Sequence, residues 1–207
     1  MKIDSVSSQP DRAGRYKVCF DDGSIMRLYR QTVQDFCLYS GKELDDEAFR
    51  QLEEAAGQMS AKMRAVRIVS ASSVSKGDLE HRLIHKGEDV QHAKQAVAWM
   101  AEMDLLDDRK TAQQIVARCA AKGYGVSRAK QALYEKRIPK AYWQDVLEDY
   151  PDQTDAIIEY LRARLDSDRD EKQTRKAIDA LLRRGHRYSE IRSAMRELSL
   201  EEEFLEE

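Results

Sequence analysis

Two histidines have a spacing that could place them on one helical face, where they could hold a metal ion. His81 and His85 form an HxxxH pair, and Glu88 and His92 follow closely in the sequence. Imidazole and carboxylate groups are common zinc ligands. The HExxH pattern of zinc enzymes is absent, however, and Gly87 predicts a turn after the first pair. We therefore predict ordinary surface histidines and no bound metal.

Two other short patterns resemble parts of active sites. The carboxylates of Asp107 and Asp108 could act in acid–base catalysis, but adjacent residues of a helix do not face each other. Acidic residues before a helix commonly cap its free N–H groups. Residues 123–125, Gly-Tyr-Gly, resemble a fragment of a phosphate-binding loop that lacks the remaining motif. No nucleophile motif such as GxSxG occurs, so we predict a protein that is not an enzyme and uses no cofactor.

Positive charge is concentrated in the middle of the chain. The 207 residues have a net charge of −3, but residues 61–140 contain 16 Lys and Arg against 9 Asp and Glu. Such a block could bind DNA phosphates or an acidic protein groove, or it could be a solvated surface. The predicted partner-binding residues are seven cations of this block: Arg118, Lys122, Arg128, Lys130, Lys136, Arg137 and Lys140.

The tryptophans and cysteines are expected to be structural. Trp99 and Trp143 could stack on single-stranded bases, but their helical spacing from other apolar residues favours the core. Cys19, Cys37 and Cys119 lack CxxC spacing, so we expect buried, reduced thiols.

The composition favours an extended helical protein. Charged residues make up 35% of the chain and aromatic residues 7%, which leaves little for one thick core. No apolar run of about 18 residues suggests a membrane span, and the first residues lack the apolar middle of a signal peptide. We expect a cytoplasmic protein without membrane contact.

The first 30 residues have strand character. β-branched and aromatic residues cluster at 2–6, 15–20 and 24–29, and Gly23 can form the tight turn of a hairpin between the last two runs. From Val33 onward the apolar spacing is helical. This pattern predicts a small β-hairpin-plus-helix module at the N-terminus.

From about Ser75 the chain repeats one pattern three times. The stretches LIHKGEDVQHAKQAV, LYEKRIPKAYWQDVL and LLRRGHRYSEIRSAM begin at Leu83, Leu133 and Leu181, at intervals of 50 and 48 residues. We interpret each stretch as a helix end, a turn and the start of a second helix. Gly87 and Gly185 stand where a left-handed residue would end the first helix.

Each repeat is predicted to contain three helices. The third helix begins after Asp107 in the first repeat and after residues 152–155 in the second, and in the last repeat it is short, frayed or missing. The first helices are expected at 75–86, 126–136 and 171–184, and the second helices at 89–103, 139–149 and 188–198.

The predicted fold class is therefore mainly α, with tandem three-helix repeats that form an elongated curved solenoid. The expected domains are the N-terminal module at 1–70 and the three repeats at 71–122, 123–168 and 169–207.

The middle of the chain resembles a known family. Residues 105–138, LLDDRKTAQQIVARCAAKGYGVSRAKQALYEKRI, run from an acidic helix start through a glycine turn to a second helix. This segment and the repeats over residues 75–198 resemble the regulatory protein RecX family, which modulates the RecA recombinase. The chain has Thr111 where the family usually has an aromatic residue, and Arg137 where it usually has glycine.

The resemblance implies a function in recombinational repair and the SOS response. A monomeric solenoid would lie in the groove of the RecA–DNA filament, where it is expected to inhibit RecA ATP hydrolysis, strand exchange and co-protease activity, or to promote filament disassembly. The seven cations would then face RecA or its DNA. A stand-alone DNA-binding helical-repeat protein is the alternative that the basic middle of the chain also allows.

Overall fold

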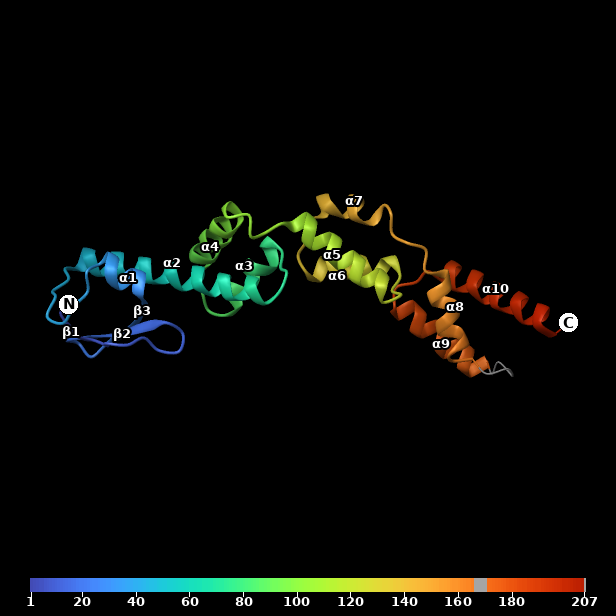
Figure 1. The fold of residues 1–207 in the computed structure, drawn as a ribbon, viewed down its shortest axis with the longest axis horizontal. Coiled ribbons are helices and arrows are strands. Elements are labelled where there is room, and N and C mark those ends of the chain that lie inside the picture. The colour runs from blue at the N-terminus through green and yellow to red at the C-terminus, as the bar shows by residue number, and fades with distance from the viewer. Residues whose placement is uncertain (166–170, 207) are drawn as a thin grey trace. The chain divides into compact units, whose positions relative to one another are not determined.

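The computed structural model describes residues 1–165 and 171–206, with side chains described as far as residue 198. The chain forms two compact units, one made of Met1–Ser73 and Leu79–Leu106, the other of Val74–Asp78 and Asp107–Glu207. Both units are mainly helical, and the first also contains a small antiparallel sheet (Figure 1). The prediction of a mainly helical protein with a small N-terminal β module is confirmed.

Three short strands form the sheet, in the order β1-β2-β3. Val18 and Phe20, two residues apart on β2, are buried because alternate side chains of a strand point to the same face. Gly23 has a φ of +83°, which lets the chain turn tightly after β2. The strands are β1 (Ile3–Val6), β2 (Arg15–Phe20) and β3 (Ile25–Tyr29). The predicted hairpin is confirmed, and the run at 2–6 forms a third strand.

Helices α1 (Arg30–Asp35) and α2 (Asp46–Ala71) follow the sheet, and α2 lies beside it (Figure 1). The carboxylate of Asp45 accepts a hydrogen bond from the N–H of Ala48 (2.7 Å), which caps the start of α2. Leu52 of α2 is fully buried in the cluster that also contains the inner residues of the sheet. Burial of one such leucine contributes about 2 kcal/mol to folding.

The first unit also contains most of α3 (Lys76–His85) and all of α4 (Val90–Glu102). Helix α4 buries Ala93, Ala96, Val97 and Met100 along one face, and it packs against α2. A Cβ atom at Gly57 of α2 would lie 2.3 Å from the ring of His92, so this glycine lets the two helices approach.

Helices make up the second unit. They are α5 (Asp108–Ala121), α6 (Val126–Glu135), the 3₁₀ helix η1 (Lys140–Tyr142), α7 (Trp143–Leu147), α8 (Thr154–Arg162), α9 (Glu171–Arg183) and α10 (Tyr188–Glu206). The expected first helices correspond to α3, α6 and α9, and the expected third helices to α5 and α8. In the part of the chain that the structure describes, no helix is long and apolar enough to cross a membrane.

Two details of the helices differ from the prediction. The expected helix at 139–149 begins after Pro139 with the 3₁₀ turn η1 and continues as the short α7, which ends at Leu147. The acidic residues after 198 continue α10 as far as Glu206. The predicted domain boundaries stay predictions, and residues 166–170 and 207, which they include, lie outside the described residues.

The leucine that begins each repeated stretch lies in a core. Leu83, Leu133 and Leu181 are at most 1% exposed, and Ile191 of the third stretch is fully buried. Trp143 is partly buried against the cluster that contains Leu133, and its Nε1 donates to the carbonyl of Ile138 (3.0 Å). The helical periodicity therefore identified these core positions correctly.

The cysteines only partly follow the prediction of buried thiols. All three are free, and Cys119 is buried, Cys19 is partly buried and Cys37 is exposed. The prediction is wrong for Cys37 because this residue lies in the tight turn after α1, where its φ is +46° and it leaves the apolar face of the helix.

Candidate partner-binding surface

The turns after α3, α6 and α9 have one backbone geometry, and we call each of these three turns a joint. Gly87, Arg137 and Gly185 occupy the left-handed position, with φ values of +87°, +52° and +89°. In each joint the N–H of this residue donates to the carbonyl three residues earlier, and the next N–H donates to the carbonyl of the buried leucine. This is the Schellman arrangement, which satisfies carbonyl groups at a helix end.

Arg137 retains this geometry without a glycine. Its two joint hydrogen bonds, from its own N–H to the carbonyl of Tyr134 and from the N–H of Ile138 to the carbonyl of Leu133, measure 2.9 and 3.0 Å. A non-glycine residue in the left-handed region costs roughly 1 kcal/mol. The departure from the RecX pattern at this position therefore costs stability but does not abolish the turn.

In the second unit, the turn between α5 and α6 packs directly against the third joint. The N–H of Gly125 donates to the carbonyl of Arg184 (3.0 Å), and the N–H of Ser127 donates to that of Gly185 (3.3 Å). A Cβ atom at Gly125 would lie 2.1 Å from the carbonyl oxygen of Gly185, and a Cβ atom at Gly185 would lie 2.3 Å from the nitrogen of Arg128. The Gly-Tyr-Gly segment is thus a helix–helix turn, as predicted, and close backbone approach requires glycine at both Gly125 and Gly185.

The carbonyl groups after α5 are satisfied by side chains from later helices and loops. Arg184 Nη2 donates to the carbonyl of Lys122 (3.3 Å), and His186 Nε2 donates to that of Gly123 (3.1 Å). Tyr150 Oη donates to the carbonyl of Tyr124 (2.7 Å). Burial raises the pKa of Tyr150 to about 12, so its hydroxyl remains a donor at neutral pH. The cationic Arg184 also suits the negative end of the α5 dipole.

His186 is buried within this junction and is only 4% exposed. Because Nε2 faces the carbonyl of Gly123, the neutral ring carries its proton on Nε2. Nδ1 has no hydrogen-bond partner among the described residues. Burial lowers the pKa of His186 below its ordinary value of 6.5, although the Gly123 carbonyl and Glu190 act in the opposite direction. The folded junction therefore favours neutral histidine.

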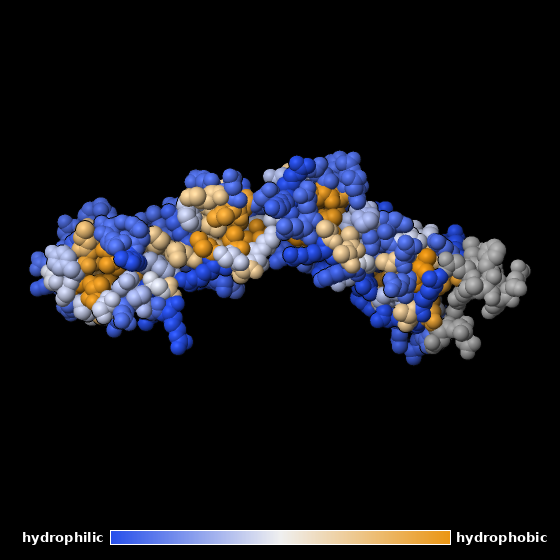
Figure 2. Space-filling view, in the orientation of Figure 1, coloured by the Kyte–Doolittle hydropathy of each residue, from blue (hydrophilic) through white to orange (hydrophobic). Residues whose placement is uncertain are grey.

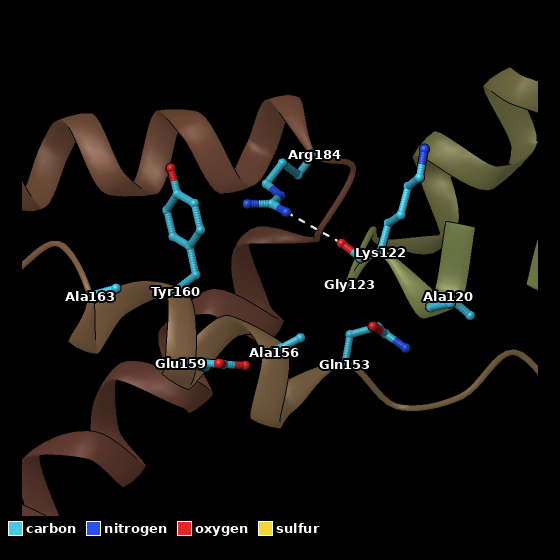
Figure 3. Close-up of a pocket in the computed structure, with 10 residues that line it drawn as sticks. Ala120, Lys122, Gly123, Gln153, Ala156, Glu159, Tyr160, Ala163 and Arg184 are labelled. Carbon is cyan, nitrogen blue, oxygen red and sulfur yellow. Dashed lines mark hydrogen bonds between the residues drawn. The ribbon is translucent and has the colours of Figure 1, made fainter. Parts of the chain in front are cut away.

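Arg184 also lies close to two tyrosine rings. Its guanidinium carbon is 4.9 Å from the ring centroid of Tyr160 and 5.5 Å from that of Tyr124, while Arg164 lies 4.2 Å from the Tyr160 ring. Figure 3 shows the Arg184 guanidinium directed toward the Lys122 carbonyl, with the Tyr160 ring nearby. Cation–π contacts of this kind contribute about 0.5–2 kcal/mol, depending on exposure.

A hollow of about 460 Å³ opens beside Arg184 in the second unit (Figure 3). Small residues of α5, α8 and the α5–α6 turn form part of its wall, and Lys122, Glu159 and Tyr160 supply polar groups. A second, smaller hollow is lined by Arg128, Arg183 and Arg184 together with Tyr124 and Tyr160. Arginines beside aromatic rings can bind anions and stacked bases.

The seven predicted cations lie on three helices and the loops between them. Arg118 is on α5, Lys122 follows α5, Arg128 and Lys130 are on α6, Lys136 and Arg137 form the second joint, and Lys140 begins η1. Five of them are exposed, whereas Arg128 and Lys136 are half-buried. Arg128 pairs with Glu135 (3.2 Å), and Lys136 pairs with Asp78 (3.5 Å).

These cations do not form a single cluster around one hollow. Lys122 and Arg128 line the two hollows beside Arg184. Arg137 and Lys140 instead line a hollow of about 390 Å³ with Tyr134 and Trp143. The basic middle of the chain thus contributes cations to separate hollows.

The carboxylates of Asp107 and Asp108 cap different helices. Asp107 accepts a hydrogen bond from the N–H of Lys110 (2.9 Å) at the start of α5. Asp108 is 7% exposed and accepts from the N–H of Lys76 (2.8 Å) in the first turn of α3. The predicted capping role is confirmed, but the helix that Asp108 caps lies earlier in the sequence.

The candidate metal ligands do not converge. The ring centroids of His81 and His85 are 6.2 Å apart. Among residues 1–165 and 171–206, no group of three or more His, Cys, Asp or Glu side chains could hold a metal ion. The structure therefore offers no ligand set for the HxxxH hypothesis in these residues.

Sequence reasoning did not identify Tyr124, Tyr160 and His186 as parts of one junction. Gly125 and Gly185 are far apart in the sequence, and a periodic pattern does not indicate that two turns contact each other. The available signal was the presence of glycine in both turns, since a glycine in a turn can mark close backbone approach as well as a positive φ.

Known proteins resemble this chain in sequence over most of its length. No family model matches the chain. The chain is 23% identical over 206 residues to "Regulatory protein RecX" of Clostridium perfringens (strain 13 / Type A), an alignment that covers 96% of each protein. It is 24% identical over 140 residues to the protein of the same name from Clostridioides difficile (strain 630), covering 67% of this chain and 66% of the relative.

Solved structures with the same fold include a crystal structure of regulatory protein RecX, with a TM-score of 0.63, 20% identity and coverage of 93% of this chain and 98% of the other. RecX from Lactobacillus salivarius gives a TM-score of 0.59 at 20% identity, covering 70% of this chain and 99% of that one. In sequence over nearly its whole length and in fold, the chain is similar to regulatory protein RecX, and the resemblance predicted from residues 105–138 and the three repeats is confirmed.

Proposed function

We propose that this protein binds the RecA–DNA filament and inhibits RecA ATP hydrolysis, strand exchange and co-protease activity. The observation that carries the proposal is sequence similarity to proteins named "Regulatory protein RecX" over 96% of the chain. In this proposal the protein acts by occupying a surface of the filament, and it supplies no catalytic group.

The repeated joints support a role in binding an extended partner. Helical repeats build long surfaces rather than deep pockets, and such surfaces can contact several subunits of an assembly. The exposed cations Arg118, Lys130 and Arg137 would face an acidic protein surface or DNA phosphates in the filament. The net charge of −3 would limit binding to DNA alone.

Hydrolysis of ATP by RecA on single-stranded DNA tests the proposal directly. The purified protein is titrated from substoichiometric to equimolar amounts against RecA, and the hydrolysis rate is expected to fall. An unchanged rate across the titration, together with unchanged strand exchange, would rule out the proposed regulatory role.

Direct DNA binding is the second candidate function. Arg183 and Arg184, beside the rings of Tyr124 and Tyr160, provide the combination of charge and aromatic faces that can hold single-stranded nucleic acid. Binding to labelled single-stranded DNA without RecA should then weaken steeply as salt rises. If no binding occurs at low ionic strength, this second function is excluded.

A further inference from the structure

Each joint is preceded by a large apolar side chain that is exposed to solvent. Ile84, Tyr134 and Leu182 lie three residues before the left-handed residue, and they are 37%, 72% and 42% exposed. Each is the last but one residue of its helix, directly after the buried leucine. The three repeats therefore expose a large apolar residue at the same structural position.

The turn geometry does not require a large residue at this position. Two other turns have the same backbone geometry, with Asp104 and Gly123 in the left-handed conformation and the same two hydrogen bonds. Three residues before the left-handed residue, these turns have Ala101 and Ala120. Alanine therefore suffices for the turn. At this position the three joints have large residues and these two turns have alanine, although exposed Met103 and Leu105 flank Asp104. We attribute the large residues of the joints to something other than the fold.

The other side of each joint is also exposed. Three residues after the left-handed position stand Val90, Lys140 and Tyr188, the first residues of α4, η1 and α10. Val90 is 44% exposed, Tyr188 is 59% exposed, and Lys140 is also exposed. Two of the three joints thus carry an exposed apolar residue on both sides, and the middle joint has the long aliphatic stem of a lysine instead.

The middle joint shows how such a pair can form a binding site. Tyr134 and Lys140 line one hollow of about 390 Å³, whose wall also includes Ile138 and Trp143. Arg137 contributes a positive charge at the same hollow, and the carboxylate of Glu135, which also lines it, pairs with Arg128 (3.2 Å). The site can therefore accept an apolar side chain and can pair with a neighbouring carboxylate.

A positive charge accompanies the exposed apolar residue in every joint. The exposed cations that lie within three positions of it are Lys86, Arg137 and Arg183. Two exposed carboxylates lie in the same ranges, Glu135, which pairs with Arg128, and Asp179. Figure 2 shows that apolar side chains on this face are bordered by hydrophilic ones. An apolar residue with a cation beside it favours a partner that presents a small apolar site edged by carboxylates.

We propose that Ile84, Tyr134 and Leu182 are three equivalent docking residues, one in each repeat, for a polymeric partner whose successive subunits each present an apolar site with an acidic edge. This inference rests on the proposed function, because the RecA filament is such a polymer of identical subunits. Tyr134 is the strongest of the three, since it is the most exposed and since aromatic residues dominate binding energy at protein interfaces.

Alanine substitutions test the proposal on a defined probe, a RecA filament assembled on single-stranded DNA with a non-hydrolysable ATP analogue. Tyr134→Ala is expected to weaken binding about 30-fold, and Ile84→Ala and Leu182→Ala about 5-fold each. Tyr134→Phe should retain most of the affinity, because the ring and not the hydroxyl supplies the contact. Circular dichroism checks that each variant is folded.

Two exposed apolar residues outside the repeats provide matched controls. Tyr39 and Ile25 are 62% and 53% exposed, and Tyr39→Ala and Ile25→Ala should change binding less than about twofold. If the unchanged protein binds the filament and the triple alanine variant binds it equally well, the docking residues are wrong while the proposed function stands. If the unchanged protein does not bind the filament, both proposals are overturned.

Discussion

The joint after α6 and the joint after α9 have the same backbone hydrogen bonds but carry different residues at the left-handed position. Arg137 stands in the first and Gly185 in the second. In the middle joint, the glycine that permits close approach is on the neighbouring segment. A Cβ atom at Gly77 would lie 3.1 Å from the Cβ of Arg137. Around Gly185, the backbone of Arg128 approaches the left-handed residue itself.

The difference separates two reasons for glycine in a turn. A positive φ alone is tolerated by arginine at a cost of roughly 1 kcal/mol, when the helix-end hydrogen bonds and a buried leucine hold the turn. Close backbone approach leaves no room for any side chain and has no such substitute. The third joint has both requirements and the middle joint has only the first, so substitutions in the two joints should have different effects.

The largest effect is expected for Gly185→Ala, which should lower the free energy of unfolding by about 3 kcal/mol or more. The added Cβ atom would lie 2.3 Å from the nitrogen and 2.7 Å from the Cβ of Arg128, and the φ of +89° adds strain. Urea unfolding followed by circular dichroism measures the loss.

Gly87→Ala is the matched control for this prediction. Gly87 has nearly the same φ, but a Cβ atom added to it would meet no other atom within 4 Å, so a loss of only about 1 kcal/mol is expected. Equal losses at Gly87 and Gly185 would mean that close approach adds nothing to the requirement for glycine.

Charge reversal in the two joints should affect filament binding differently. Changing Lys130, Lys136 and Arg137 together to Glu is expected to weaken binding at least about tenfold, because Lys130 and Arg137 are exposed and available to a partner. Changing Arg183 and Arg184 to Glu should have a smaller effect on binding, since Arg184 is held by the Lys122 carbonyl and two tyrosine rings. Equilibrium binding at several salt concentrations compares the two variants, and equal losses would show that the third joint contributes as much as the middle one.

Arg137→Gly should stabilise the protein by about 0.5 kcal/mol. Glycine removes the cost of the left-handed conformation, although it also gives the unfolded chain more freedom. The midpoint of urea unfolding should rise. Lys136→Gly, one position earlier, is the control: its φ of −87° gives glycine no advantage, and its ion pair with Asp78 would be lost, so a lower midpoint is expected.

The smallest effect is a pH dependence confined to the third joint. Because the pKa of His186 is lowered in the folded protein, the unfolded state takes up the proton first as pH falls through 6.5. Stability should therefore fall as pH drops from above 6.5 toward the folded-state pKa, although Glu190 reduces the effect and Arg184 increases it. The predicted range therefore begins near the ordinary value of 6.5 and extends below it.

His186→Gln isolates this contribution, because its side-chain amide can donate to the Gly123 carbonyl but does not titrate. The difference in unfolding free energy between the unchanged protein and the variant should become smaller or reverse as pH falls. A difference independent of pH in that range would show that protonation of His186 does not weaken the joint.

Local patterns of the sequence predicted much of the fold. Alternation and a glycine identified the β2–β3 hairpin, and helical spacing identified Leu133, Leu181 and Ile191 as core positions. The capping role of Asp107 followed from its place before an apolar run. These features depend on residues that are close in the sequence, so their physical causes are visible in it.

Features that depend on distant contacts were not predictable in the same way. The contact between Gly125 and Gly185, the rings beside Arg184 and the helix capped by Asp108 all require knowledge of which segments pack together. Arg137 could be recognised as unusual, but its retained left-handed turn depends on hydrogen bonds that only the folded backbone provides. The seven cations were recognisable as a group, whereas their division between separate hollows was not.

The satisfied carbonyls after α5 have a consequence for the order in which the chain folds on the ribosome. The side chains that bond to Lys122 and Gly123 come from Arg184 and His186, 62 and 63 residues later. At about 5–20 residues per second, a ribosome needs about 3–13 s to synthesise that interval. During this time those two carbonyls must bond to water, and so must the N–H groups of Gly125 and Ser127, which donate to Arg184 and Gly185 in the finished protein. A nascent chain stalled before residue 184 should therefore exchange these two amide protons faster than the finished protein.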